Sequence, residues 1–210
     1  KWIAAWTEVD SEEQLLLHSA DNSVAPKQVG KVPPGWYMEP VWSPDGKSIA
    51  WGDQRYHLYV TDVGTGAQAR VDSGEWEIRS YEWSPDSRFL AYTLAITNGY
   101  NQVRIWDSKE KKVHALSDPM FNSRAATWDP NGKYICYLSD RAINPYLDRT
   151  EARFIVNNAT VPVVVVLEAD SLLPFAARSD IDPAAGTKKG DEGKKDEKDG
   201  KDGKGDEKAK

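Results

Sequence analysis

One ten-residue pattern recurs three times along the chain, and it limits the fold more than any other feature of the sequence. The copies WSPDGKSIAW, WSPDSRFLAY and WDPNGKYICY begin at Trp42, Trp83 and Trp128, which are 41 and 45 residues apart. Each copy consists of a tryptophan, a polar turn, a basic residue and a short apolar run. A repeat of about 40 to 45 residues that contains several short strands is typical of the blades of a β-propeller.

The polar turn has a composition that explains why a hairpin forms there. In residues 43–46, Ser-Pro-Asp-Gly, the proline favours a type I turn and Gly46 tolerates a positive φ angle. Residues 129–132, Asp-Pro-Asn-Gly, repeat this arrangement. The middle copy has Ser87 in place of the glycine, and a left-handed serine there is expected to cost about 1 kcal/mol.

The first residues of the chain, KWIAAW, fit the same pattern without its first half. Lys1 aligns with the basic residue of each complete copy, namely Lys47, Arg88 and Lys133, and an apolar run follows it. We therefore predict that residues 1–6 form the second strand of a blade whose tryptophan and turn are missing.

The segments around each copy complete a unit of about four strands. Short segments such as WYMEPVW and WEIRSYEW come before the turn, and YHLYVTD or NQVRIWD follow it. The sequence therefore predicts an all-β fold for residues 1–183, a partial β-propeller of about four blades with four antiparallel strands each. The nine Trp and nine Tyr are expected mainly to pack between blades, with an aromatic ligand cage as the alternative.

The last unit and the tail depart from the repeat. After its turn the fourth unit runs through a longer polar connection into FIV, and VPVVVVLEAD at residues 161–170 is expected to form an outer or penultimate strand. Residues 188–210 contain nine Lys, eight Asp or Glu, five Gly and one Ala. Because such a segment has almost nothing to bury, residues 184–210 are predicted to be a flexible linker. Neither a calcium loop nor a nucleic-acid patch fits its spacing of charges.

Charge and composition exclude several classes of function. The formal net charge is −6 and the pI is about 5.2, which argues against nucleic-acid binding. The apolar runs are of strand length, so no membrane span is predicted. Cys136 is the single cysteine, which allows no intrachain disulfide, and it is expected to be a buried structural thiol.

No arrangement of reactive residues predicts a catalytic or metal site. His18, His57 and His114 fall in separate units at different offsets, and no nucleophile elbow, His-Glu-x-x-His motif or phosphate loop is present. We therefore assign no catalytic, cofactor-binding or metal-binding residue and no cofactor. The charged pairs of residues 140–141, 148–149 and 178–180 are interpreted as ion pairs or loop anchors.

The repeat resembles the propeller repeats of the TolB family, the prolyl-oligopeptidase group and the tricorn proteases. The last unit, WDPNGKYICYLSDRAINPYLD followed by VPVVVVLEADSLLPFAARSD, resembles the end of the first, six-bladed propeller of tricorn-type serine proteases. In that comparison, residues 173–175 (Leu-Pro-Phe) replace a Ser-Pro-Phe-like motif and the charged tail corresponds to a linker.

This resemblance implies a function for the parent protein rather than for these residues alone. Tricorn-like enzymes are large, oligomeric, cytoplasmic peptidases, and their serine machinery lies in later domains. The chain is thus expected to be a non-catalytic propeller segment that acts as a peptide filter or exit channel and as a scaffold. Its expected partners are peptides, other domains of the same chain and further copies in a homo-oligomer, but neither nucleic acid nor membrane. The alternative is a TolB-type protein-interaction module.

Overall fold

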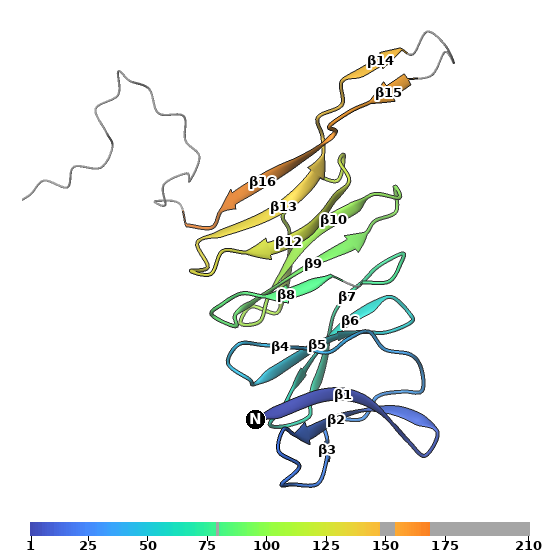
Figure 1. Cartoon of the computed structure of the whole chain (residues 1–210), viewed down its shortest axis with the longest axis vertical. Coiled ribbons are helices and arrows are strands. Elements are labelled where there is room, and N and C mark those ends of the chain that lie inside the picture. The colour runs from blue at the N-terminus through green and yellow to red at the C-terminus, as the bar shows by residue number, and fades with distance from the viewer. Residues whose placement is uncertain (79, 148–153, 169–210) are drawn as a thin grey trace, which may run out of the picture. The chain divides into compact units, whose positions relative to one another are not determined.

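The computed structural model describes residues 1–78, 80–147 and 154–168, which contain sixteen β-strands in five antiparallel sheets (Figure 1). The chain divides into two units, residues 1–172 and 173–210, and all described strands belong to the first. The expected boundary between residues 183 and 184 and the charged pairs 148–149 and 178–180 lie outside the described residues. Within those residues, no helix is long and apolar enough to cross a membrane.

The strands follow one another in the sheets as they do in the sequence. The first sheet contains β1 (Trp2–Val9), β2 (Glu12–Ser19) and β3 (Lys27–Gln28). The second contains β4 (Val41–Trp42), β5 (Ser48–Gly52), β6 (His57–Asp62) and β7 (Gln68–Ser73). The third contains β8 (Tyr81–Trp83), β9 (Phe89–Ala95), β10 (Asn101–Asp107) and β11 (Lys112–Ala115). These antiparallel sheets of three to four strands confirm the predicted all-β propeller fold.

The fourth sheet combines β12 (Ser123–Trp128), β13 (Tyr134–Asp140) and β16 (Thr160–Val166). Between its second and third strands the chain forms a separate hairpin of β14 (Pro145–Leu147) and β15 (Phe154–Val156). The FIV segment therefore belongs to an inserted hairpin. The valine-rich segment is the third strand of this sheet and the outer one among the described strands, and β16 pairs with β13 along its whole length.

The basic residue of each repeat makes the same backbone hydrogen bond in all four sheets. Its carbonyl oxygen accepts the N–H of the residue that follows the next strand of the sheet. The bonds are Ala20 to Lys1 (3.0 Å), Val63 to Lys47 (2.9 Å), Ser108 to Arg88 (2.9 Å) and Leu167 to Lys133 (3.0 Å). β1 is the first strand of its sheet, and this hydrogen bond makes it equivalent to β5, β9 and β13.

The three predicted turns share one geometry. Gly46, Ser87 and Gly132 each donate a backbone hydrogen bond to the residue three positions earlier, at 2.8 to 2.9 Å, and have φ angles of 70°, 62° and 71°. Ser87 is therefore left-handed, as the alignment required. Its hydroxyl accepts a hydrogen bond from the backbone N–H of Asp45 in the neighbouring turn at 3.0 Å, which offsets part of the conformational cost.

The described core consists of three apolar clusters, one between each pair of successive sheets among the first four. Alternate residues of a strand contribute to different clusters because side chains alternate between the two faces of a sheet. Ile49 and Trp51 of β5 pack toward the first sheet, whereas Ala50 packs toward the third. Leu90 and its neighbours at alternate positions of β9 pack toward the second sheet, whereas Ala91 packs toward the fourth.

Aromatic side chains also form hydrogen bonds between sheets. The indole N–H of Trp83 donates to the carbonyl oxygen of Val41 at 3.2 Å, and that of Trp128 donates to Glu82 at 3.1 Å. Each acceptor directly precedes the tryptophan of the previous repeat. The repeated tryptophan therefore joins its own sheet to the one before it, by packing and by a hydrogen bond whose length lies near the usual range.

Candidate functional site

Two kinds of connection lie at the same end of the strands in the stacked sheets. In a four-stranded antiparallel sheet whose strands follow the sequence, the turn between the second and third strands and the link from the fourth strand to the next sheet lie at one end of the strands. Here the former include residues 10–11, 53–56 and 96–100, and the latter include residues 29–40, 74–78 and 116–122. We call the surface formed at this end of the strands the loop face.

A cavity of about 490 Å³ opens on the loop face between the third and fourth sheets. It is lined by residues 99–101, residues 120–122, Asp140, Ile143, Val156 and Ala159. Large apolar side chains with exposed surface, those of Tyr100, Met120, Ile143 and Val156, form part of this lining. This cavity, the 3–4 cavity, is the candidate functional site.

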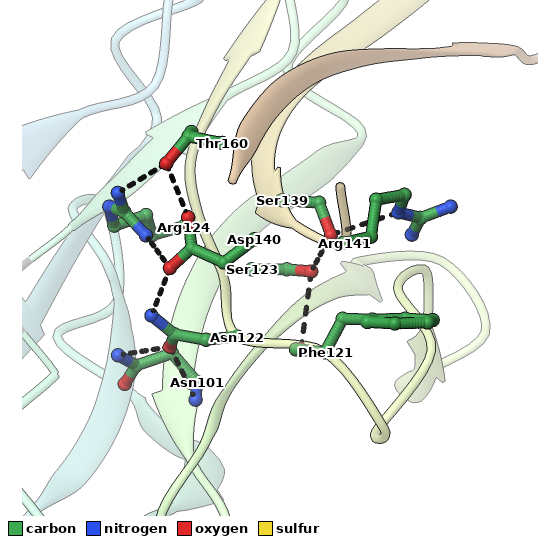
Figure 2. Close-up of polar contacts among 9 residues, drawn as sticks. All are labelled: Asn101, Phe121, Asn122, Ser123, Arg124, Ser139, Asp140, Arg141 and Thr160. Carbon is green, nitrogen blue, oxygen red and sulfur yellow. Dashed lines mark hydrogen bonds and ion pairs between the residues drawn. The ribbon is translucent and has the colours of Figure 1, made fainter. Parts of the chain in front are cut away.

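Asp140, the last residue of β13, is held on the polar side of the 3–4 cavity by three side chains (Figure 2). Its Oδ2 accepts hydrogen bonds from Arg124 Nη1 at 2.7 Å and Asn122 Nδ2 at 2.9 Å, and its Oδ1 accepts one from Thr160 Oγ1 at 2.5 Å. These bonds, that from Arg124 above all, lower the pKa of Asp140 to about 2. The carboxylate is therefore charged at neutral pH and is compensated by Arg124.

Asn122 extends this network from the fourth sheet to the third. Its Oδ1 accepts hydrogen bonds from the backbone N–H of Asn101 at 3.1 Å and from Asn101 Nδ2 at 3.0 Å. Its carbonyl oxygen accepts the backbone N–H of Asp140 at 2.9 Å. Since each of these polar groups is fixed by others, the polar side of the cavity is organised before any ligand arrives.

A β-bulge in β12 accompanies the position of Arg124. The pairing of β12 with β13 shifts between Arg124 and Thr127, and Ala125 within the bulge has a φ angle of 55°. Bulges bend a strand and redirect its side chains, often next to functional sites. The guanidinium of Arg124, beside this bulge, contacts Asp140 on the adjacent strand.

Two buried serines lie beside this network but show no sign of activation. Ser123 Oγ lies 3.1 Å from Ser139 Oγ and 3.4 Å from the carbonyl oxygen of Phe121 (Figure 2). Ser139 Oγ also accepts a hydrogen bond from Arg141 Nε at 3.1 Å, and the Arg141 guanidinium lies over the Phe121 ring. A nucleophilic serine needs a neighbouring base, whereas these hydroxyls contact another hydroxyl, a guanidinium and a carbonyl group.

The three histidines lie in three different sheets, on β2, β6 and β11. His18 Nε2 is 3.2 Å from Thr7 Oγ1, and His57 Nδ1 is 3.0 Å from Asp53 Oδ2 within the same turn. His114 is exposed. The structure therefore does not bring them together. In the part of the chain that the structure describes, no group of three or more His, Cys, Asp or Glu side chains is placed to hold a metal ion.

Two sequence interpretations change with the structure. Cys136 is half-buried rather than fully buried, because it faces away from the cluster to which Ile135 belongs. Asp140 does form an ion pair, as the sequence interpretation allowed, but its partner is Arg124, whereas Arg141 donates a hydrogen bond to Ser139. Asp140 ends β13 and Arg141 follows it, and their side chains extend in opposite directions (Figure 2).

Sequence reasoning missed the residues that complete the 3–4 cavity. Asn101, Asn122 and Thr160 are single polar residues at strand ends, and no local motif marks them. The segment FNSRAATW differs from the corresponding segments of the two preceding repeats by its two alanines, residues 125–126, which fall where the pairing of β12 shifts.

Successive antiparallel sheets joined by repeated tryptophans define this chain as part of a β-propeller. A family model described as "Tricorn protease second beta propeller domain" matches residues 1–206. The chain therefore belongs to the tricorn protease second β-propeller domain family. This match corrects the expectation of the first propeller, which rested on the last unit and the tail, because the family model that matches describes the second propeller.

Relatives and a solved structure agree with this assignment. The tricorn protease of Thermoplasma volcanium is 30% identical over 154 residues, which cover 69% of this chain and 15% of that protein. A tricorn protease homolog of Saccharolobus solfataricus is 26% identical over 163 residues, or 76% of this chain and 15% of the relative. A crystal structure of the tricorn protease matches 85% of this chain and 18% of its own, with a TM-score of 0.73 and 21% identity. The chain thus spans about 15% of the length of these relatives, and the structural match supports the fold.

Proposed function

We propose that this chain is a non-catalytic part of a tricorn-like serine protease and binds peptides that pass to or from the catalytic domains. The observation that carries this proposal is the 3–4 cavity, which combines an apolar rim with fixed polar groups on the loop face. In this role the propeller serves as a filter and a scaffold. The parent enzyme is proposed to be a cytoplasmic homo-oligomer.

The cavity suits a peptide because its apolar rim can cover a peptide side chain and its polar side can form hydrogen bonds with the peptide backbone. The apolar rim of Tyr100, Met120 and Ile143 can cover an aliphatic or aromatic side chain. On the polar side, the Asp140 carboxylate can accept a hydrogen bond from a peptide N–H, and the second N–H of Asn122 Nδ2 can donate to a peptide carbonyl oxygen. Sites for small ligands commonly combine an apolar surface with a few fixed polar groups.

The same geometry favours binding over hydrolysis. Arg124 compensates the charge of Asp140 and holds its carboxylate, so Asp140 is a poor general base at neutral pH. The hydroxyls of Ser123 and Ser139 are buried and bonded to each other. The polar groups of the cavity can therefore orient a peptide without attacking it.

The proposal is tested with the 210-residue chain and a labelled peptide of ten residues that carries one central leucine. Binding is followed by fluorescence anisotropy, and the peptide is examined for cleavage by mass spectrometry. Ile143→Asp places a charge on the rim, where the isoleucine is 63% exposed. The matched control is Val24→Asp, at a residue that is 57% exposed and lies outside the cavity lining.

We expect Ile143→Asp to weaken binding about tenfold, because a charge next to an apolar side chain is costly, while Val24→Asp leaves it unchanged. The peptide should remain intact. If Ile143→Asp and Val24→Asp had equal effects on binding, the 3–4 cavity would not be the peptide-binding site. Cleavage sensitive to a serine-directed inhibitor would overturn the non-catalytic assignment. Absence of any peptide binding would favour the protein-interaction module instead.

A further inference from the structure

Two tryptophans on the loop face are exposed, although the tryptophan of the complete repeats is largely buried. The side chains of Trp36 and Trp76 are 76% and 67% exposed, whereas Trp83 and Trp128 are buried. The two exposed residues are 40 residues apart and both lie in connections that link one sheet to the next. Large exposed aromatic side chains in corresponding links of two successive repeats indicate a ligand-binding surface.

Trp36 lines a cavity together with three glutamates. A second cavity of about 500 Å³ is lined by Trp36, Glu8, Glu12 and Glu13 together with small and polar residues. The field of these carboxylates reaches the ring next to the tryptophan in sequence: burial, followed by the charges of Asp53, Glu12 and Glu13, raises the pKa of Tyr37 to about 12. A ligand that enters this cavity meets an indole face and a negative field.

Glu75 and Glu77 flank Trp76 in the sequence, so this link is acidic too. Cations bind over the faces of aromatic rings, most strongly over tryptophan, and carboxylates nearby add to the attraction. The chain itself uses this contact elsewhere, because Lys111 Nζ lies 4.9 Å from the centre of the Trp106 ring. The formal net charge of −6 favours a basic ligand over an acidic one.

We propose that Trp36 and Trp76 bind the basic side chains of an extended polypeptide, with one arginine or lysine over each indole. This surface is distinct from the 3–4 cavity. It would make the chain prefer peptides that carry basic residues. The inference rests on the proposed function in one respect, namely that the ligand is a peptide. Two sites on one face also raise affinity through simultaneous contact when the linking chain can span them.

The test compares two labelled peptides with the 210-residue chain by fluorescence anisotropy. The first is a ten-residue Gly/Ser peptide with four arginines, and the second has glutamine at the same four positions. Trp36→Ala and Trp76→Ala are measured singly and together, with Trp36→Phe as the conservative variant. Trp2→Ala is the matched control, since Trp2 is 44% exposed but lies on β1 outside both cavity linings.

We expect the arginine peptide to bind more tightly than the glutamine peptide, with an advantage that decreases as salt is added. Each Trp→Ala substitution should weaken binding of the arginine peptide about two- to fivefold, as exposed cation–π contacts do. The double substitution should weaken it about tenfold, and Trp36→Phe should lose less than Trp36→Ala.

Equal binding of the two peptides, or an effect of Trp2→Ala as large as that of Trp36→Ala, would overturn the inference. The leucine peptide of the previous section separates this failure from that of the proposed function. If Ile143→Asp still weakens the leucine peptide while neither exposed tryptophan affects the arginine peptide, peptide binding at the 3–4 cavity stands and the basic surface does not.

Discussion

Removing one hydroxyl group measures how strongly the second and third sheets are joined. Tyr92 of β9 is fully buried, and its hydroxyl donates a hydrogen bond of 2.6 Å to Asp72 Oδ2 on β7 of the neighbouring sheet. Arg104 Nη1 donates to the same oxygen at 2.9 Å. The substitution Tyr92→Phe removes the first bond and keeps the ring in the core.

The expected loss follows from the kind of acceptor. A hydrogen bond to a charged group contributes about 1.5–3 kcal/mol, and Arg104 still pairs with Asp72 in the variant, so we expect a loss of about 2 kcal/mol. Tyr81 belongs to the same apolar cluster, but its hydroxyl donates to the backbone carbonyl of Glu39 at 2.5 Å. Because that acceptor is neutral, Tyr81→Phe should cost only about 1 kcal/mol.

The assay is urea unfolding at pH 7, followed by tryptophan fluorescence. Burial, followed by the bond to Asp72, raises the pKa of Tyr92, and burial raises the pKa of Tyr81 to about 12. A phenol whose pKa is raised in the folded state contributes its full stability below its unfolded pKa of about 10, and loses it as the pH rises further. Both contributions are therefore complete at pH 7. A loss for Tyr92→Phe no larger than that for Tyr81→Phe would refute the reasoning.

Two further predictions concern the turns and the 3–4 cavity. Ser87→Ala should cost about 1 kcal/mol, since it loses the bond from Asp45 but remains left-handed. Ser87→Gly should be nearly neutral, because relief of the positive φ offsets the lost bond; urea midpoints decide, and equal losses would contradict the account. The pKa of Asp140 falls from 3.8 to about 2 on folding, so its contribution is present above about pH 4 and is lost as the pH falls toward 2. Asp140→Asn should therefore be less stable than the natural chain at pH 7, with a gap that narrows at pH 3; a gap that does not change with pH would show that the ion pair with Arg124 contributes nothing.

The sequence predicted the repeat architecture because the signal for it is local. The turn residues, the basic residue and the apolar run that follows lie within ten positions, and their physical roles depend little on the rest of the chain. The alignment of Lys1 with the basic residues of the other repeats agrees with the equivalent backbone hydrogen bonds for this reason. The left-handed conformation of Ser87 could likewise be expected from its alignment with two glycines.

The candidate site could not be predicted in the same way. The contacts of Asp140 with Arg124 and Thr160 join three strands, and the bulge in β12 that accompanies the position of Arg124 has no turn motif to announce it. The exposed positions of Trp36 and Trp76 were missed because tryptophan in a repeat is usually read as core. Whether a tryptophan in a link is buried depends on whether its side chain points toward the neighbouring sheet or toward solvent.

The sequence by itself determined the blade, with its strand order, its turns and the alternation of core residues, because each of these follows from interactions between near neighbours. Only the tertiary structure decided where cavities and exposed tryptophans lie on the loop face. Cavities and exposed indoles arise from the meeting of two sheets and their connections, and no single repeat contains both sides of that contact.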